Sequence, residues 1–118
     1  AYGFDAANRM LSGDAQPSAL VVASMITALG VRRAIEAQGK VLGRDVSVVT
    51  FDDDLSYLRN GSDAEPVFTA ARSSVREAGR RVADILISRI DDPFAPPRTE
   101  LVPYRFLVGP TTGPAAGT

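Results

Sequence analysis

Residues 46–54, VSVVTFDDD, are the stretch that decides the fold. Residues 46–50 are β-branched or small and mostly apolar, which is typical of a strand buried on both faces. Phe51 ends this run, and three carboxylates follow at once. In open α/β sheets, ligands bind in the crevice beyond the carboxyl ends of the strands. The stretch therefore predicts a parallel sheet, with Asp52 facing a crevice at its carboxyl edge.

The composition of the 118 residues is that of a globular domain, and it excludes several kinds of site. Hydrophobic residues make up 45% and charged residues 23%, and the net charge of −1 gives this segment no electrostatic basis for binding nucleic acid. Cysteine and histidine do not occur, which excludes disulfides, the usual zinc sites and the commonest general base. There is no signal-peptide pattern and no run of about 18 apolar residues, so we expect no membrane contact.

Two serines mark the starts of the longest helical patterns. Ser24 is placed to cap a helix over residues 25–38. Ser74 and Glu77 have the spacing of a capping box, which predicts an amphipathic helix over residues 74–91.

Shorter patterns complete the expected architecture. Alternating helical and extended segments predict an α/β fold of three α/β/α layers with a mainly parallel sheet. Residues 98–108 contain Pro103, which favours an edge strand, and residues 109–118 have the composition of a flexible tail. Apolar spacing further predicts a helix over residues 4–12 and strands over residues 18–23 and 67–72.

Six motifs follow one another in an order that resembles the sugar-responsive bacterial repressors of the lac/gal (LacI/GalR) family, at the end of their effector-binding core. The likeness covers essentially the whole chain. The motifs are SALVVAS at 18–24, RAIEAQG at 33–39, DVSVVTFDD at 45–53, P-x-x-T-x-x-R at 66–72, GRRVADILI at 79–87 and LVPYRFLVGPTTGP at 101–114.

This resemblance implies a periplasmic-binding-protein-like fold of two α/β subdomains with a ligand cleft between them. Residues 1–108 would be a fragment of the effector-binding and dimerisation domain, with the helix over 74–91 crossing to the other subdomain. It also implies a cytoplasmic regulator without enzyme activity or cofactor. Operator DNA would be bound only through an N-terminal helix-turn-helix that this sequence does not contain.

The same resemblance assigns the ligand-binding residues. Asp52 corresponds to the acid of the cleft, and Ser24 to the polar residue that opens the long helix. Arg72 and Ser73 follow the crossover strand, and Phe51 would offer an apolar face to a sugar. Other positions differ from the family's pattern. Thr50 stands where the family has glycine, and Met25, Ala70, Ser73 and Gly109 replace an acid, a threonine, a glutamine and an arginine, so several polar partners of a sugar are missing. The effector is therefore expected to carry fewer hydroxyl groups than a hexose, or the response to be lost.

A homodimer interface is also implied. Met25 and Leu29 lie on a second apolar stripe of the helix over 25–38, which suits either the core or a subunit interface. The resemblance favours the interface. Tyr57 and Leu58, apolar residues in an otherwise polar loop, suit the same surface.

Two other functions fit parts of the sequence. A periplasmic sugar-binding transport receptor would share the fold. VVTFDDDLS also resembles the nucleophile motif of haloacid-dehalogenase-type phosphatases, with Asp52 attacking phosphorus, Asp54 as acid/base and Mg²⁺ bound by both. That chemistry needs a lysine after the motif, and the one lysine, Lys40, comes before it.

Overall fold

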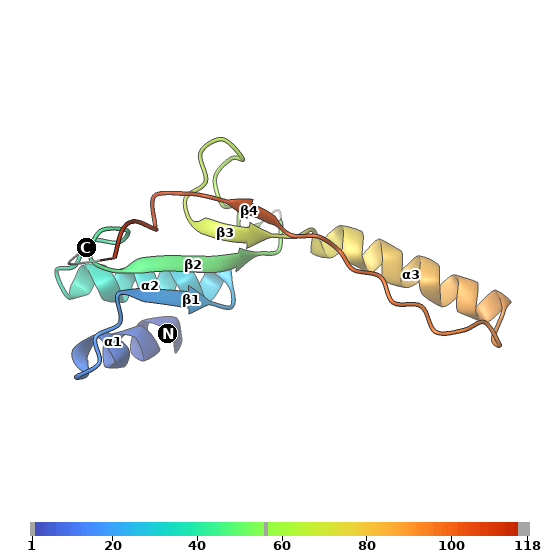
Figure 1. The fold of residues 1–118 in the computed structure, drawn as a ribbon, viewed down its shortest axis with the longest axis horizontal. Helices are drawn as coiled ribbons and strands as arrows, with labels where there is room; N and C mark the ends of the chain where they lie inside the picture. Colours follow the sequence, from blue (N-terminus) through green and yellow to red (C-terminus); the bar gives the residue numbers. More distant parts are fainter. Residues whose placement is uncertain (1, 56, 116–118) are drawn as a thin grey trace.

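The computed structural model describes residues 2–55 and 57–115, which form an open sheet with helices on one side and a long projecting arm (Figure 1). The order of elements along the chain confirms the expected alternation of helices and strands. The elements are α1 (Tyr2–Ser12), β1 (Ala19–Val22), α2 (Met25–Ala37), β2 (Ser47–Asp52), β3 (Thr69–Arg72), α3 (Val75–Asp91) and β4 (Arg105–Leu107).

The sheet has the strand order β1-β2-β3-β4. β1, β2 and β3 are parallel, and β4 joins β3 in the antiparallel direction, so the predicted mainly parallel sheet is confirmed. β2 runs one residue further than the apolar pattern indicates, because it includes Asp52. Phe51 pairs with Ala71 and Asp52 with Arg72, so Asp52 is the last residue of the strand and not the first residue of a loop.

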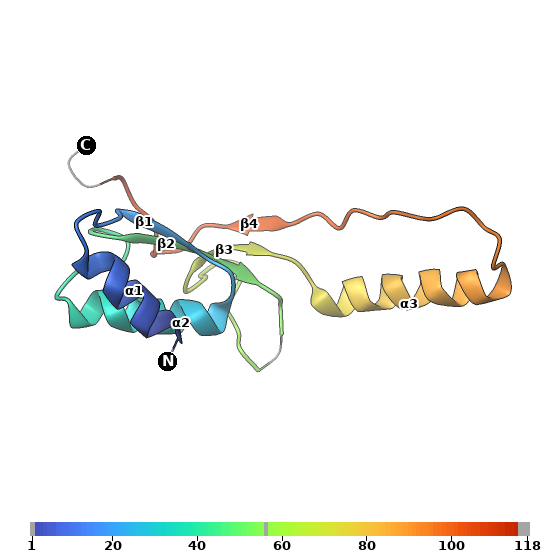
Figure 2. The same cartoon turned by 90° about the horizontal axis from the view of Figure 1, so that it is seen from below.

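Helices α1 and α2 both lie on the same face of the sheet (Figure 2). α2 packs on β1 and β2, and α1 packs on α2. The two helices come close because Gly3 faces the carbonyl of Thr27, and a Cβ on Gly30 would lie 2.8 Å from the backbone nitrogen of Phe4.

Within residues 2–55 and 57–115, no helix covers the other face of the sheet. Val21 of β1 is 77% exposed, and Phe51 and Phe106 are also exposed there. The expectation that residues 46–50 are buried on both faces holds only in part, because Val49, which shares this face with Phe51, is partly exposed. The reason is that the helices supply one covering layer and the apolar residues of the opposite face have no cover.

Both predicted helix caps are present. The Ser24 hydroxyl accepts a hydrogen bond from the Thr27 backbone N–H at 3.3 Å, and the Ser74 hydroxyl accepts one from the Glu77 N–H at 3.1 Å. The capping box of α3 is only half formed, because the Glu77 side chain turns to Arg81 one turn later.

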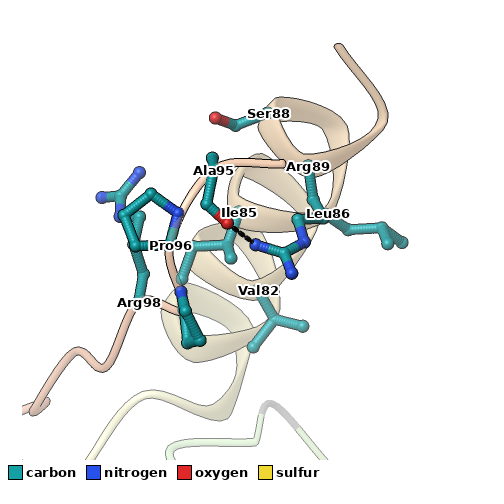
Figure 3. A pocket seen from close by; sticks show the side chains of 9 residues that line it. Val82, Ile85, Leu86, Ser88, Arg89, Ala95, Pro96 and Arg98 are labelled. Atoms are coloured by element: carbon teal, nitrogen blue, oxygen red, sulfur yellow. Dashed lines mark hydrogen bonds between the residues drawn. The ribbon is translucent and has the colours of Figure 1, made fainter. Parts of the chain in front are cut away.

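Helix α3 and the extended segment that follows it form a projecting arm, which we define as residues 75–104. Within the described residues, α3 packs against no other helix or strand, and none of its side chains is buried. The extended segment runs back along α3, and its first residues lie beside Val82, Leu86 and Arg89. The guanidinium of Arg89 donates a hydrogen bond to the carbonyl of Ala95 (Figure 3). The radius of gyration is 18.3 Å, against about 13–14 Å for a compact chain of this length.

The C-terminal segment is not a free tail as far as the structure describes it. The Thr111 hydroxyl accepts from the Thr69 N–H at 2.9 Å and donates to the Val48 carbonyl at 2.7 Å, and Thr111 is buried. The predicted flexible tail is therefore wrong for the segment around Thr111, because its hydroxyl and backbone groups bind β2 and β3. Residues 116–118 lie outside the described residues. No helix in the described part of the chain is long and apolar enough to span a bilayer.

Candidate functional site

Polar side chains from three strand ends meet at the carboxyl edge of the sheet. Ser24 follows β1, Asp52 ends β2 and Arg72 ends β3. Because these strands are parallel, their carboxyl ends lie at one edge. The structure thus brings together three of the residues that the sequence predicted for the ligand site.

Asp52 is buried, with only 2% of its surface exposed. It shares the helix-covered face of β2 with Thr50 and Val48, since side chains alternate along a strand. Its Oδ2 accepts a hydrogen bond from Arg72 Nε at 2.8 Å, and its Oδ1 accepts one from the Asp54 backbone N–H at 2.9 Å. Asp52 is therefore part of an internal ion pair, and both of its carboxylate oxygens are bound by groups of the protein.

A small hollow of about 50 Å³ links Ser24 to Asp52. Its remaining walls come from the start of α2 and the loop after β2. Besides accepting the capping bond, the Ser24 hydroxyl donates to Thr27 Oγ1 at 2.9 Å, so its side chain is oriented within the hollow. This hollow is too small for a sugar, and a ligand would touch Ser24 and Asp52 from its rim.

Phe51 does not share a side of the sheet with Asp52, because neighbouring strand residues point to opposite faces. Its ring packs edge-to-face on Tyr104, with 5.9 Å between ring centroids. Ser73 stays near the site through its backbone, whose N–H donates to the Asp52 carbonyl at 3.0 Å. The structure thus separates the predicted aromatic face from the predicted acid.

Arg72 carries the electrostatics of this edge. Only 13% of its side chain is exposed, and its guanidinium also donates to Asp63 of the loop between β2 and β3. Arg105 of β4 donates to the other oxygen of Asp63 at 2.9 Å. A chain of four charges, Asp52, Arg72, Asp63 and Arg105, therefore joins three strands and one loop.

These contacts shift the pKa values of Arg72 and Asp63. Partial burial alone would lower the pKa of Arg72, but the hydrogen bond and charge of Asp52, with the charges of Asp63 and Asp54, raise it overall. The hydrogen bond from Arg105 and its charge lower the pKa of Asp63, with Arg72 adding to the effect. Both groups are therefore charged throughout the physiological range.

The sequence did not single out Asp63, Arg105 or Asn60. Asp63 and Arg105 lie 42 residues apart, and only the pairing of β3 with β4 brings them together. Asn60 is fully buried; its Oδ1 accepts from the Phe68 N–H at 2.7 Å and its Nδ2 donates to the Phe68 carbonyl at 2.8 Å. Asn60-Gly61 is a turn dipeptide, and this was the local signal for an anchored loop.

The four predicted interface residues divide into two groups. Met25 is 7% exposed and belongs to the hydrophobic core, and Leu58 is partly buried and packs against that core. Leu29 and Tyr57 are exposed, Tyr57 at 74%. Ile26, which was not predicted, is exposed beside them at the start of α2.

The arrangement does not suit the phosphatase motif. A nucleophilic carboxylate must reach phosphorus, whereas both oxygens of Asp52 are bound by groups of the protein. Among the described residues, no cluster of three or more acidic side chains could hold a metal ion.

Comparison with known proteins gives the family. The profile of the periplasmic binding protein-like domain matches residues 2–112. The HTH-type transcriptional regulator AglR of Rhizobium meliloti is 37% identical over 114 residues, which are 97% of this chain and 32% of AglR.

Solved structures agree. A LacI family transcriptional regulator from Bifidobacterium animalis subsp. lactis has a TM-score of 0.78 at 25% identity, covering 97% of this chain and 40% of that one. The lac repressor dimer bound to operator and the anti-inducer ONPF has a TM-score of 0.77 at 29% identity, covering 95% of this chain and 37% of that one. The chain spans about a third of the length of these relatives. It therefore belongs to the periplasmic binding protein-like domain family, among the LacI-type transcriptional regulators, whose C-terminal part it matches.

Proposed function

We propose that this chain is part of the effector-sensing and dimerising core of a LacI-type repressor that works in the cytoplasm. The observation that carries the proposal is the convergence of Ser24, Asp52 and Arg72 at the carboxyl edge of a parallel sheet. This edge is where open α/β folds bind small molecules. The effector would be a sugar or a related small molecule, held at the rim of this edge, with Ser73 beside it and Phe51 on the far side of the strand.

Sensing would be a shift between two conformations. A ligand that binds better when the cleft is closed favours the closed arrangement by its difference in affinity for the two states. Closure would then change how the subdomains are oriented across a dimer. Binding and reorientation suffice, and no covalent bond is made or broken.

The arm supports the idea that this chain reaches into a second subdomain. Val82, Leu86 and Ile90 of α3 form one apolar stripe of the helix, the kind of stripe that usually packs on another surface. All three side chains are exposed here. Exposed apolar surfaces of this kind mark contacts with another protein surface. We infer that the first subdomain, which precedes this segment in the relatives, packs on that stripe.

The surface formed by Ile26, Leu29 and Tyr57 supports a homodimer. These side chains are apolar and exposed at the start of α2 and in the loop after β2. The lac repressor was solved as a dimer bound to operator. By analogy, this surface would meet its copy in a second chain, while operator DNA would be bound by an N-terminal helix-turn-helix.

A thermal-shift screen of the native-length protein tests the proposal, with sugars, sugar phosphates, nucleosides and Mg²⁺ as ligands. A ligand that binds only the folded state raises the unfolding midpoint. We expect a sugar-class ligand to do so, and Asp52→Asn to abolish the shift. Asp45→Asn is the matched control, because Asp45 also pairs with a neighbouring arginine, at 2.9 Å, but precedes β2. A response to Mg²⁺ alone, or a sugar response that survives Asp52→Asn, would contradict the proposal.

A further inference from the structure

Two guanidinium groups stand side by side at the carboxyl edge of the sheet. Arg72 and Arg105 are register partners of β3 and β4, so their side chains leave the same face of the sheet. Both donate to one carboxylate, that of Asp63, each to a different oxygen. Paired guanidinium groups are well suited to carboxylate and phosphate, because their planar forks match the oxygens of these anions.

Asp63 reaches this pair from a surface turn. Its side chain is 53% exposed, whereas Arg72 is largely buried. The base of the turn is fixed by the buried Asn60, which binds both backbone groups of Phe68. The Asp63 carboxylate can therefore leave the arginines by rotating its side chain, while the turn itself stays in place.

The surroundings of this carboxylate are rich in positive charge. A polar hollow of about 420 Å³ is lined by Arg59 and Arg76 as well as Arg72. In the described part of the chain, the guanidinium groups of Arg59 and Arg76 have no ion-pair or hydrogen-bond partner. If Asp63 turned away, Asp52 and Asp54 would be the remaining carboxylates among the residues that line the hollow. Arg105 would then lose the one ion-pair partner that it has among the described residues.

We propose that the effector carries an anionic group, a phosphate ester or a carboxylate, which binds Arg72 and Arg105 in the place that Asp63 occupies. The inference rests on the proposed function, since this hollow shares Asp52 with the sheet edge described above. Asp63 is then an internal counter-ion that fills the site when no effector is bound. Asp52 holds Arg72 in position through the 2.8 Å bond to its Nε, which leaves the other nitrogens of the guanidinium for the anion.

Anion affinity, measured by calorimetry on the native-length protein at constant ionic strength, tests the inference. The probes are inorganic phosphate, glucose 6-phosphate, glucuronate and glucose. Asp63→Asn removes the internal competitor and should tighten phosphate binding about tenfold, roughly the contribution of one charge-assisted hydrogen bond. Arg105→Gln should weaken it by about tenfold. Arg44→Gln, which removes an exposed arginine before β2, is the matched control and should change nothing.

The outcomes separate the inference from the proposed function. Unchanged or weaker phosphate binding in Asp63→Asn would overturn the inference, and Asp63 would then have only a structural role. Measuring at a temperature below the unfolding midpoints of the wild-type and variant proteins excludes loss of folding as the cause. Glucose binding as tightly as both anionic sugars, and abolished by Asp52→Asn, would overturn the anionic group but keep the sensing function. Failure of every probe to bind would count against both. Tighter binding of glucose 6-phosphate than of glucuronate would identify a phosphate ester, and the reverse a carboxylate.

Discussion

Replacing Arg72 by methionine should destabilise the protein much more than replacing its partner Asp52 by asparagine. Methionine keeps the length and apolar stem of the side chain but removes every donor. Asp52, 2% exposed, would then keep only the Asp54 backbone N–H as a partner. Leaving one charge of a buried pair uncompensated costs about 3–5 kcal/mol.

The reverse change is milder for a geometric reason. After Asp52→Asn, Arg72 keeps Asp63 and its own contact with solvent, so the loss should be about 1–2 kcal/mol. The double variant should cost about as much as Asp52→Asn alone, because the uncompensated carboxylate is gone. The coupling free energy between the two sites, which is the sum of the two single losses minus the loss of the double variant, should then be about 3–5 kcal/mol.

Urea unfolding of the single and double variants measures these differences. With a slope of about 2 kcal/mol per molar, Arg72→Met should lower the midpoint by about 2 M. Arg44→Met is the control, since an exposed arginine pair contributes about 0–1 kcal/mol. The reasoning is refuted if Arg72→Met and Arg44→Met differ by less than about 1 kcal/mol, or if Asp52→Asn costs as much as Arg72→Met.

Three further predictions concern the loop, the arm and the response to acid. Asn60→Ala leaves the backbone N–H and carbonyl of Phe68 unpaired, and it should lower the free energy of unfolding by about 2–5 kcal/mol, measured in urea. A loss below about 1 kcal/mol would contradict this role of the Asn60 amide. Gly79→Ala should slow hydrogen exchange of the α3 amides about fivefold, because alanine favours the helix by about 1 kcal/mol over glycine. The added Cβ would meet no atom within 4 Å, so no clash opposes this gain. Faster exchange would mean that the position is constrained. The pKa values of Asp63 and Asp45 are lowered in the folded state by their arginine partners, so the unfolded chain binds protons more readily, and stability should begin to fall below about pH 4 as the pH drops. Unfolding midpoints between pH 6 and 3 should show this loss, and asparagine at either position should reduce it.

Local signals in the sequence predicted the elements well. Ser24 and Ser74 begin their helices as expected, because capping depends on residues only three positions apart. β1 and β2 are parallel because a helix connects them, and the spacing of apolar residues within a short stretch is enough to predict that helix. These features could be predicted because each depends on a short stretch of chain.

The environment of the site could not be predicted in the same way. The burial of Asp52 depends on β2 continuing to its own position, which in turn depends on pairing with Arg72, 20 residues later. The role of Asp63 depends on Arg105, which lies 42 residues after Asp63 in the sequence. Similarly, Thr111 lies in a segment whose composition suggests disorder, yet its hydroxyl binds two strands. In each case the deciding partner is distant in sequence and is brought near by strand register.

The four linked charges at the sheet edge, those of Asp52, Arg72, Asp63 and Arg105, also lie where the sheet connects to the arm. Within the described residues there are two such connections. β3 ends at Arg72, and α3 begins at Val75; the chain returns from the arm and enters β4 at Arg105. Asp63 holds both arginines at once. Because α3 packs on no other helix or strand, its orientation relative to the sheet depends on these two connections. A ligand that exchanges with Asp63 would therefore act on both connections together, and this gives the proposed sensor a direct physical link between its binding edge and the orientation of the arm.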